Sequence, residues 1–288
     1  MFPGFEVGHY QTMDTEIAYR KGGEGPPLLL LHGYPQTHVM WHKIAPALAE
    51  RFSVVAADLR GYGDSGKPLR DVCHTNYSKR TMALDQVELM AGLGFDHFSV
   101  VGHDRGARVA HRMALDHPDR IGKVAVLDIA PTLTMYEGTD MAFASAYYHW
   151  FFLIQPYDLP ERLIGADPGY YLERKLAAWG RREGAFTPEA VAEYRRCFDD
   201  PATIEATCED YRAAASIDLE HDRADARRKI SAPLLVLWGG RGVVAATYDV
   251  LATWREKAED VRGKALDCGH FLPEEEPEET LKELLAFL

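Results

Sequence analysis

Short apolar runs alternate with longer amphipathic stretches through the first half of the 288-residue chain. The apolar runs predict buried strands at residues 28–31, 52–57, 98–102 and 123–127. The amphipathic stretches predict helices at residues 40–50, 79–93 and 107–115. Strands and helices that alternate in this way are typical of βαβ units on a mostly parallel sheet. We therefore predict an α/β fold with a doubly wound sheet.

The pattern changes after Pro131. From there to about Asp218 the chain has no strand-like run, carries many aromatic residues and keeps helical spacing. Apolar runs return at 233–238 and 264–266, and a last helix is predicted at about 278–287. We predict a core domain formed by residues 1–130 and 219–288, with residues 131–218 inserted between core strands as a helical cap. The acidic cluster at 274–276 is interpreted as a solvated loop and helix start.

Composition narrows the class of protein without identifying it. A formal net charge of −12 argues against a nucleic-acid partner, because such surfaces need a basic footprint. The longest aliphatic run is too short to cross a bilayer, and the first residues lack the basic and apolar segments of a signal peptide. Four widely spaced cysteines without a C-x-x-C pair predict free thiols rather than a metal or redox site. We expect a cytoplasmic globular protein with no membrane partner.

The strongest chemical signal is the sequence Gly102-His103-Asp104-Arg105-Gly106, which joins a predicted strand to a predicted helix. It has the form of the G-x-nucleophile-x-G turn, with Asp104 in the nucleophile position. The plain alternative is an aspartate that caps a helix. A carboxylate nucleophile is suited to displacing a leaving group from saturated carbon, which forms an ester on the enzyme. Water must then hydrolyse that ester, so the site also needs a general base and an oxyanion hole.

Two further residues complete a predicted triad. His270 lies in Cys268-Gly269-His270, between a predicted strand and the last helix, where the base of an α/β-hydrolase is found. No carboxylate follows the strand at 233–238, whereas Asp128 ends the strand before it. Asp128 is therefore the candidate partner that orients His270, and its alternative role is a loop cap.

The loop after the first core strand predicts an oxyanion hole. Its sequence, His32-Gly33-Tyr34-Pro35, matches the H-G-x-P pattern. In that pattern one backbone N–H comes from the loop and a second from the residue after the nucleophile. We assign the two N–H groups to Tyr34 and Arg105.

Two arginines stand at the start of the helix that follows the nucleophile. Arg105 and Arg108 are three residues apart, so they share a helix face, and a helix N-terminus favours anions. Pairs of arginines on helices often serve only solubility. Next to a catalytic carboxylate, however, two guanidinium groups suit the capture of a substrate carboxylate. The pair predicts a short 2-substituted acid as substrate.

The predicted cap carries three donors that could stabilise a departing halide. His149 and Trp150 offer N–H groups, and Tyr211 offers an O–H group. Aromatic residues on helices are more often part of a core, and that interpretation remains open at this point.

In combination these residues resemble the haloacetate (fluoroacetate) dehalogenases of the α/β-hydrolase superfamily. The similar stretches are Gly102 to Arg108, Leu127 to Pro131, Tyr147 to Trp150 and Cys268 to His270. The resemblance implies hydrolysis of a haloacetate to glycolate and halide, without a metal or an organic cofactor. It implies the roles given above for Asp104, His270 and Asp128. It also implies carboxylate binding by Arg105 and Arg108, halide binding by His149, Trp150 and Tyr211, and a homodimer.

Three alternatives compete with this interpretation. An epoxide hydrolase also uses an aspartate nucleophile and could use Tyr148 and Tyr211 as acids, although an uncharged epoxide has no use for two arginines. Haloalkane dehalogenases typically have Trp after the nucleophile and Asn in the H-G-x-P loop, where this chain has Arg105 and Tyr34. A binding module with a dormant site would need an incomplete triad. The sequence leaves open whether C–F bonds are cleaved or only C–Cl and C–Br bonds.

Overall fold

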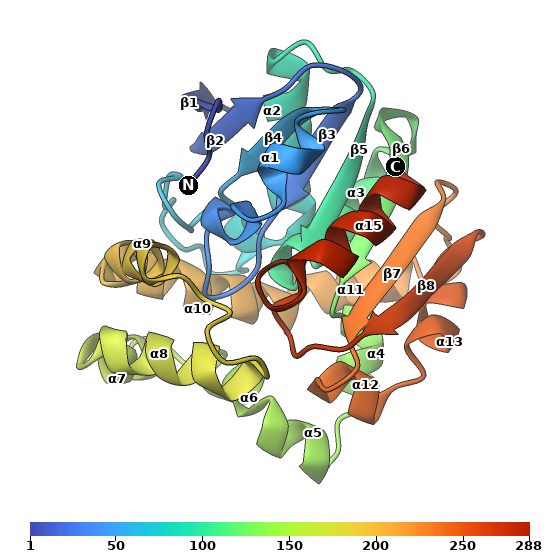
Figure 1. Cartoon of the computed structure of the whole chain (residues 1–288). Coiled ribbons are helices and arrows are strands. Elements are labelled where there is room, and N and C mark those ends of the chain that lie inside the picture. The colour runs from blue at the N-terminus through green and yellow to red at the C-terminus, as the bar shows by residue number, and fades with distance from the viewer.

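The core of the molecule is an eight-stranded sheet, as a computed structural model of residues 1–288 describes it (Figure 1). The strand order is β1-β2-β4-β3-β5-β6-β7-β8. The pairings β1–β2 and β2–β4 are antiparallel, and all the others are parallel. The strands are β1 Glu6–Gln11, β2 Glu16–Gly22, β3 Pro27–Leu31, β4 Ser53–Ala57, β5 Phe98–His103, β6 Ile121–Leu127, β7 Leu234–Gly239 and β8 Val261–Leu266.

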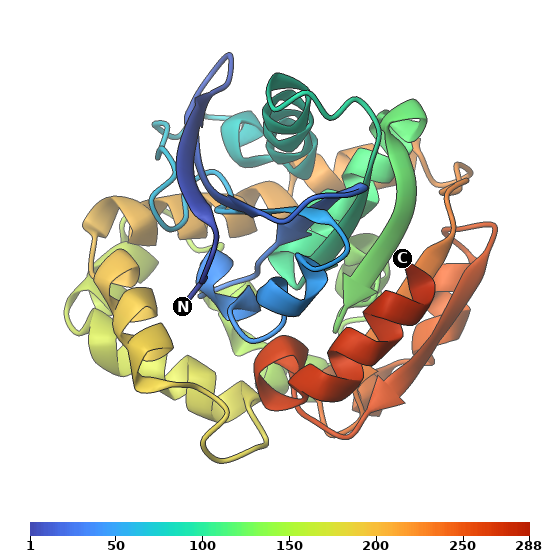
Figure 2. The same ribbon diagram turned by 45° about the horizontal axis from the view of Figure 1, so that its top comes forward.

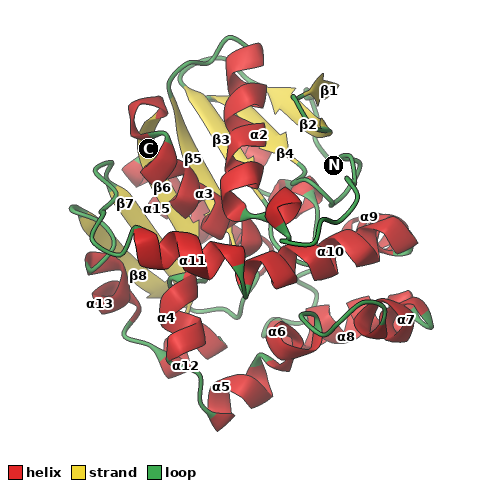
Figure 3. Ribbon diagram, turned by 180° about the vertical axis from the view of Figure 1, so that it is seen from behind, coloured by secondary structure: helices red, strands yellow, loops and turns green.

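Helices cover both faces of this sheet. One face carries α1 (Ala45–Leu48) and α15 (Pro277–Phe287), which lie in front of the strands in Figure 1. The other face carries α2 (Lys79–Gly92), α3 (Arg105–Asp116) and α11 (Ile217–Ala224). Figure 3, which views the molecule from the opposite side, shows these helices in front of the strands. The central strands β3, β4 and β5 are almost completely buried. Strands covered on both faces read as continuous apolar runs, which is why the sequence predicts them.

Three parts of the fold differ from the sequence-based expectation. Strands β1 and β2 were not predicted, because they form a ribbon at the sheet edge in which β1 alternates exposed and half-buried residues and has no apolar run (Figure 2). The helix predicted at 40–50 is split into a 3₁₀ turn, His38–Trp41, and α1. Pro46 explains the break, because proline lacks the N–H of a continuous helix and clashes with the carbonyl four residues earlier.

The acidic cluster at 274–276 was also interpreted wrongly. Glu274 and Glu275 are each only 1% exposed, within the short helix α14 (Leu272–Glu275). They are buried because each carboxyl group has hydrogen-bond partners inside the protein: the hydroxyl of Tyr194 for Glu274 and backbone N–H groups for Glu275. Buried acidic groups are tolerated under that condition.

One uninterrupted stretch of helices separates β6 from β7 and lies beyond the carboxyl ends of the strands (Figures 1 and 3). The predicted core–cap junction at residue 218 falls within α11, and the division into two domains stays a prediction. The helices before α11 are α4 Thr132–Glu137, α5 Met141–Ala146, α6 Tyr148–Phe152, α7 Leu159–Gly165, α8 Pro168–Trp179, α9 Pro188–Phe198 and α10 Pro201–Ala214.

The carboxyl ends of the parallel strands meet at the edge that these helices cover. The loops after β3, β5, β6 and β8 therefore bring residues from distant parts of the sequence together at that edge. The register places Leu31 beside Gly102 and His103 beside Leu127. The remaining helices, α12 (Val243–Thr247) and α13 (Val250–Arg255), lie between β7 and β8 in the chain. No helix is long and apolar enough to cross a membrane.

Candidate active site

Asp104 occupies a tight turn between β5 and α3. Its backbone has φ 47° and ψ −112°, a conformation that non-glycine residues seldom adopt. The turn leaves no room for side chains on either side. A Cβ at Gly102 would lie 2.4 Å from the carbonyl oxygen of Gly106, and a Cβ at Gly106 would lie 2.4 Å from that of His32. Such strain persists only where the surrounding structure enforces it, and it is concentrated at functional sites.

The carboxylate of Asp104 faces the loop after β3. The backbone N–H of Tyr34 donates a hydrogen bond of 2.9 Å to Oδ1 of Asp104. Gly33 permits this approach, because a Cβ there would lie 2.4 Å from the Cβ of Asp104. Arg105 is the first residue of α3, and the first N–H groups of a helix have no partner within the helix. The N–H of Tyr34 thus contacts the carboxyl group of Asp104, whereas the oxyanion-hole role of the Arg105 N–H stays a prediction.

His270 and Asp128 are in direct contact, although 142 residues separate them in the chain. Nδ1 of His270 lies 2.5 Å from Oδ2 of Asp128, and Oδ1 of Asp128 accepts a 2.9 Å hydrogen bond from the N–H of Gly239. Both side chains are buried. Position 239 cannot carry a side chain, because its Cβ would lie 1.8 Å from the carbonyl oxygen of Gly269. The carboxylate that contacts His270 comes from the end of β6.

The electrostatics of these groups suit a carboxylate nucleophile and a basic histidine. Burial alone would raise the pKa of Asp104, but His270, with His103 and the two arginines, holds that pKa below its ordinary value. Burial disfavours the charged ring of His270, yet the hydrogen bond and charge of Asp128 outweigh it and raise the pKa of His270. His103 packs beneath the base, with ring centroids 4.5 Å apart, and its Nε2 donates to the carbonyl oxygen of His270 at 2.8 Å.

Arg105 and Arg108 are both buried beside Asp104, but their partners differ. Arg105 binds Asp210 of α10 through Nε at 2.8 Å and Nη2 at 2.7 Å, while its Nη1 has no partner. Arg108 donates to the backbone oxygen of Ala130 at 3.1 Å and to the hydroxyl of Thr132 at 3.0 Å, and its Nε is unpaired. It has no ion pair with any carboxylate. Arg108 is therefore a buried cation without an ion pair, although the nearby charge of Asp104 favours its charged form.

Sequence reasoning did not find Asp210. Besides Arg105, it is bound by the ammonium group of Lys79 from α2 and accepts a 2.6 Å hydrogen bond from the hydroxyl of Tyr62. Burial would raise the pKa of Asp210, but Arg105 and Lys79 lower it strongly. One signal was available in the sequence, because Asp210 directly precedes Tyr211, a residue already assigned to the site. This cluster fixes the orientation of the Arg105 fork.

The three predicted halide donors converge above the arginines. His149 and Trp150 come from α6 and Tyr211 comes from α10, and all three are at most 2% exposed. The Tyr211 ring lies 5.6 Å from that of His149 and 6.4 Å from that of Trp150. The Arg105 guanidinium lies 4.2 Å from the Tyr211 ring, and that of Arg108 lies 4.8 Å from the Trp150 ring.

These three groups have no hydrogen-bond partner in the protein. The unpaired atoms are Nδ1 of His149, Nε1 of Trp150 and the hydroxyl oxygen of Tyr211. Leaving such a buried group unpaired costs about 1–3 kcal/mol. Burial, reinforced by Lys175 and His270, lowers the pKa of His149 well below its ordinary value, so the ring is neutral. A small acceptor in this space would satisfy all three groups together.

Trp179, at the end of α8, is a second residue that the sequence did not single out. Its ring lies 4.6 Å from that of His149 and 5.6 Å from that of His270. Its carbonyl oxygen accepts a 3.1 Å hydrogen bond from the N–H of His270. It thus joins the predicted halide side to the predicted base, and helical spacing alone could not distinguish it from other buried aromatic residues.

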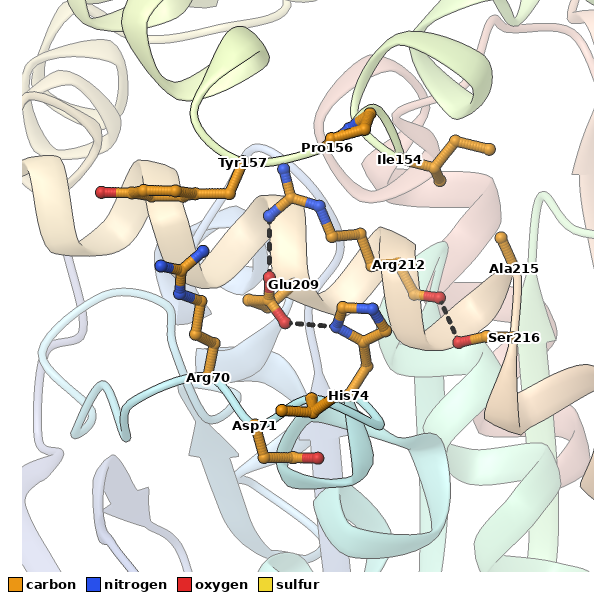
Figure 4. A pocket seen from close by; sticks show the side chains of 11 residues that line it. Arg70, Asp71, His74, Ile154, Pro156, Tyr157, Glu209, Arg212, Ala215 and Ser216 are labelled. Carbon is orange, nitrogen blue, oxygen red and sulfur yellow. Dashed lines mark hydrogen bonds and ion pairs between the residues drawn. The ribbon is translucent and has the colours of Figure 1, made fainter.

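The largest cavity lies elsewhere, at about 630 Å³ between α10 and the loop at 70–74. Figure 4 shows Glu209 in this cavity, with Arg212 and His74 bound to its carboxylate. None of the predicted site residues lines it. Helix α10 separates the two regions: Glu209 and Arg212 line the cavity, whereas Asp210 and Tyr211 contact Arg105. No group of three or more His, Cys, Asp or Glu side chains is arranged to hold a metal ion.

Comparison with known proteins gives consistent relatives. A family model described as "alpha/beta hydrolase fold" matches residues 26–277. The chain is 47% identical to a fluoroacetate dehalogenase of Burkholderia sp, with 100% of this chain and 95% of that protein covered. It is 38% identical to a soluble epoxide hydrolase of Corynebacterium sp. (strain C12), with 98% and 97% covered. A crystal structure of a Nostoc sp PCC 7120 protein assigned to the alpha/beta hydrolases superposes with a TM-score of 0.99 at 64% identity, with 100% and 99% covered.

Proposed function

The chain belongs to the α/β-hydrolase family, and on that premise we propose that it is a haloacetate dehalogenase. The reaction converts a haloacetate and water to glycolate, a halide ion and a proton. The observation that carries this proposal is the buried pair Arg105 and Arg108, which holds more positive charge than Asp210 neutralises. A buried charge without a partner is costly, and a substrate carboxylate would pair with it.

The substrate is bound through its carboxylate. The free Nη1 of Arg105 and the unpaired Nε of Arg108 are the available donors. Asp210 holds Arg105 in a fixed orientation, so this guanidinium needs little reorganisation when the acid binds. The two cations also offset the repulsion between an anionic substrate and the anionic nucleophile. This accounts for anion binding in a protein whose net charge is −12.

In the first step, a carboxylate oxygen of Asp104 forms a bond to the α-carbon as the carbon–halogen bond breaks. The electron pair of that bond leaves with the halide, and the product is a carboxymethyl ester of Asp104. His149, Trp150 and Tyr211 receive the halide, because their unpaired N–H and O–H groups are the donors that gain a partner as charge develops. Interactions that strengthen in the transition state are those that accelerate the reaction.

In the second step, His270 takes a proton from water, and the resulting hydroxide attacks the carboxyl carbon of Asp104. Asp128 binds the Nδ1 side of His270, which leaves Nε2 free to face the water. The N–H of Tyr34, already on an oxygen of this carboxyl group, stabilises the oxyanion together with the N–H of Arg105. Collapse breaks the ester bond to the glycolate oxygen, which takes the proton that the attacking hydroxide brought. This releases glycolate and restores the carboxylate of Asp104, and the proton on His270 passes to solvent.

The experiment that tests this function is halide release from fluoroacetate and chloroacetate in parallel, measured with ion-selective electrodes. Asp104→Ala serves as the blank, and we expect no release from it. Fluoride release by the wild type would establish cleavage of the C–F bond. Chloride without fluoride would limit the enzyme to weaker carbon–halogen bonds. If neither ion appeared, the dehalogenase assignment would be wrong.

Epoxide hydrolysis remains the second candidate, because one relative at 38% identity is an epoxide hydrolase and the same nucleophile would serve. Of the two tyrosines that could act as acids, Tyr211 is buried beside Arg105, whereas Tyr148 is 51% exposed and its ring covers Lys175. Only one of them is thus in the position that the reaction needs. Turnover of a neutral epoxide without halide release from either acid would favour this candidate.

We also propose that the protein is a cytoplasmic homodimer. All four cysteines are free thiols, which suits a reducing compartment. Three large apolar side chains within residues 157–163 of the inserted stretch are half-exposed or more: Tyr157, Leu159 and Leu163. Clustered exposed apolar residues favour contact with another protein. Light scattering coupled to size-exclusion chromatography should give twice the chain mass, and the chain mass alone would refute the dimer.

A further inference from the structure

Glu275 is a buried carboxylate whose three partners are all backbone N–H groups. Oε1 accepts a 2.9 Å hydrogen bond from Phe271, and Oε2 accepts hydrogen bonds of 2.9 Å from Gly269 and 2.7 Å from Arg181. It forms no ion pair with lysine or arginine. Hydrogen bonds to a charged acceptor are about twice as strong as neutral ones, so this carboxylate firmly fixes the three peptides that it binds.

Two of those peptides flank the candidate base. Gly269 and Phe271 lie on either side of His270, so Glu275 holds the chain immediately before and after it. The N–H of His270 itself donates to the carbonyl oxygen of Trp179. The fit is close, because a Cβ at Gly269 would lie 2.6 Å from that same carbonyl oxygen. The backbone of the base is therefore held on three consecutive residues.

The third peptide belongs to the inserted stretch. Arg181 follows α8, whose last residue, Trp179, packs its ring against both His149 and His270. Glu275 therefore ties the loop of the base to the segment at 179–181. This attachment adds to the hydrogen bond from the N–H of His270 to the carbonyl oxygen of Trp179.

We propose that Glu275 is a positioning residue for His270, which holds the base in its working orientation through the peptides of Gly269 and Phe271 and ties it to the segment at 179–181. This inference rests on the proposed function, in which His270 acts only on the ester. Loss of the Glu275 carboxylate therefore slows hydrolysis of the ester and leaves formation of the ester intact. The negative charge has a second effect, because it favours the imidazolium that His270 becomes when it takes a proton from water.

The test is a rapid-mixing measurement of chloride release from chloroacetate by Glu275→Gln. The glutamine amide places an NH₂ group where the carboxylate accepts a hydrogen bond from a backbone N–H. Two donors then face each other, so the loop loses its fixed position. We expect a burst of about one chloride per active site at the wild-type rate, then a steady rate lowered by roughly 10- to 100-fold, as small misplacements of catalytic groups produce. Mass spectrometry should find a carboxymethyl ester on Asp104.

Glu274→Gln is the matched control. Glu274 is equally buried on the same short helix, but it binds the hydroxyl of Tyr194 at 2.9 Å and the amide of Gln36. Burial raises the pKa of Glu274 to about 8, so glutamine replaces an acid that is protonated at neutral pH. This variant should keep both phases at their wild-type rates. If Glu275→Gln does not fold, Glu275→Asp withdraws the carboxylate by one methylene and is measured in the same way.

Four outcomes would overturn the inference. One is a wild-type steady rate in the Glu275 variant. Another is an equal slowing of burst and steady phases, which would mean that Glu275 only supports the fold. The third is absence of halide release from chloroacetate by the wild type, which would remove the proposed function and this inference with it. The fourth is a steady rate lowered to the same extent in Glu274→Gln, which would show that the effect does not depend on the Glu275 contacts.

Discussion

The two halves of the active site differ in how their polar atoms are paired. On the core side, Asp104 accepts a hydrogen bond from Tyr34, and Asp128 is hydrogen-bonded to both Gly239 and His270. On the side formed by the inserted helices, the N–H and O–H groups at the site have no partner. These are the side chains of His149, Trp150 and Tyr211.

The difference separates two tasks. Groups that must hold a fixed geometry throughout the reaction are satisfied within the protein, so they contribute to stability and to orientation at once. Groups that await a ligand atom are left unsatisfied, and each costs stability until that atom arrives. Arg105 combines both features, because two nitrogens bind Asp210 and a third is free.

The largest effect on turnover is expected when His270, on the core side of the site, is replaced. In His270→Asn the amide can still bind Asp128 but cannot take a proton from water, so kcat should fall by roughly 10³- to 10⁴-fold. Because the first step does not need the base, the ester on Asp104 should accumulate. Intact-protein mass spectrometry after one turnover measures this. Steady turnover within tenfold of the wild type would contradict the role given to His270.

The wild-type enzyme should show the same dependence as a function of pH. Asp128 raises the pKa of His270, and a protonated imidazole cannot act as a base. Ester hydrolysis should therefore slow as the pH falls through that raised pKa, while the initial burst of halide persists. Rapid-mixing measurements across this range separate the two phases.

The second prediction compares the two arginines. Arg108→Met should lower kcat/KM for chloroacetate by roughly 10²- to 10³-fold, the effect of removing one partner of a buried charge pair. It should lower the melting temperature less than Arg105→Met does, because it removes hydrogen bonds to Ala130 and Thr132 but leaves no carboxylate without a partner. Arg105→Met should have a comparable kinetic effect but destabilise the fold by about 3 kcal/mol, because Asp210 loses a buried ion pair. Equal losses of stability in the two variants would contradict this distinction.

A smaller effect is expected at the halide side. Tyr211→Phe removes one of the unpaired donors, and a hydrogen bond to a charged group is worth about 1.5–3 kcal/mol. This corresponds to a loss of roughly 10- to 100-fold in kcat/KM for fluoroacetate, with less effect on bromoacetate, since bromide leaves more easily and accepts weaker hydrogen bonds. The melting temperature should not fall, because the hydroxyl has no partner in the free protein. Equal losses with both substrates would argue against halide binding.

The smallest effect on turnover is expected at an unpaired charge that lies away from the reacting atoms. Lys175 is 2% exposed, has no hydrogen bond or ion pair, and lies 3.7 Å from the Tyr148 ring. Burial lowers the pKa of Lys175 to about 7. In the unfolded chain its pKa is about 10.4, so the folded state loses stability as the pH falls from about 10 toward 7.

Lys175→Met removes that cost. The variant should melt at a higher temperature than the wild type at about pH 6, and the difference should close as the pH rises toward 10. Calorimetry of both proteins at several pH values tests this. A difference that stays constant with pH would mean that the gain comes from packing alone.

The parts of the molecule that the sequence predicts are those with a local signal. Strand β5, the turn at Asp104 and helix α3 are consecutive, so composition and spacing identify all three. The contact between His270 and Asp128 was predictable despite its sequence separation, because both residues follow parallel strands whose carboxyl ends meet at one edge.

Residues whose role depends on tertiary packing were not predictable. Asp210 lies on α10, which is buried along nearly its whole length, and its pairing with Arg105 depends on how that helix packs in the folded protein. Glu274 and Glu275 belong to a run of three glutamates, and such a run suggests solvent exposure. Both are nevertheless buried, because groups distant in the sequence, at Tyr194 and Arg181, donate hydrogen bonds to them. Strands β1 and β2 lack an apolar run because their ribbon is only half covered.

The uninterrupted course of the chain from α4 to α11 has a practical meaning for protein engineering. Grafting this stretch from a relative needs only two splice points and would replace His149, Trp150 and Tyr211 together. If these residues bind the halide, the graft would change the leaving-group preference. The arginines proposed to bind the substrate carboxylate would stay those of the host protein. The graft also replaces Asp210, however. A donor sequence without an acidic residue at that position would leave the buried guanidinium of Arg105 without its ion-pair partner in the recipient. A library of such chimaeras should therefore be filtered on position 210 before any is screened for a new halide.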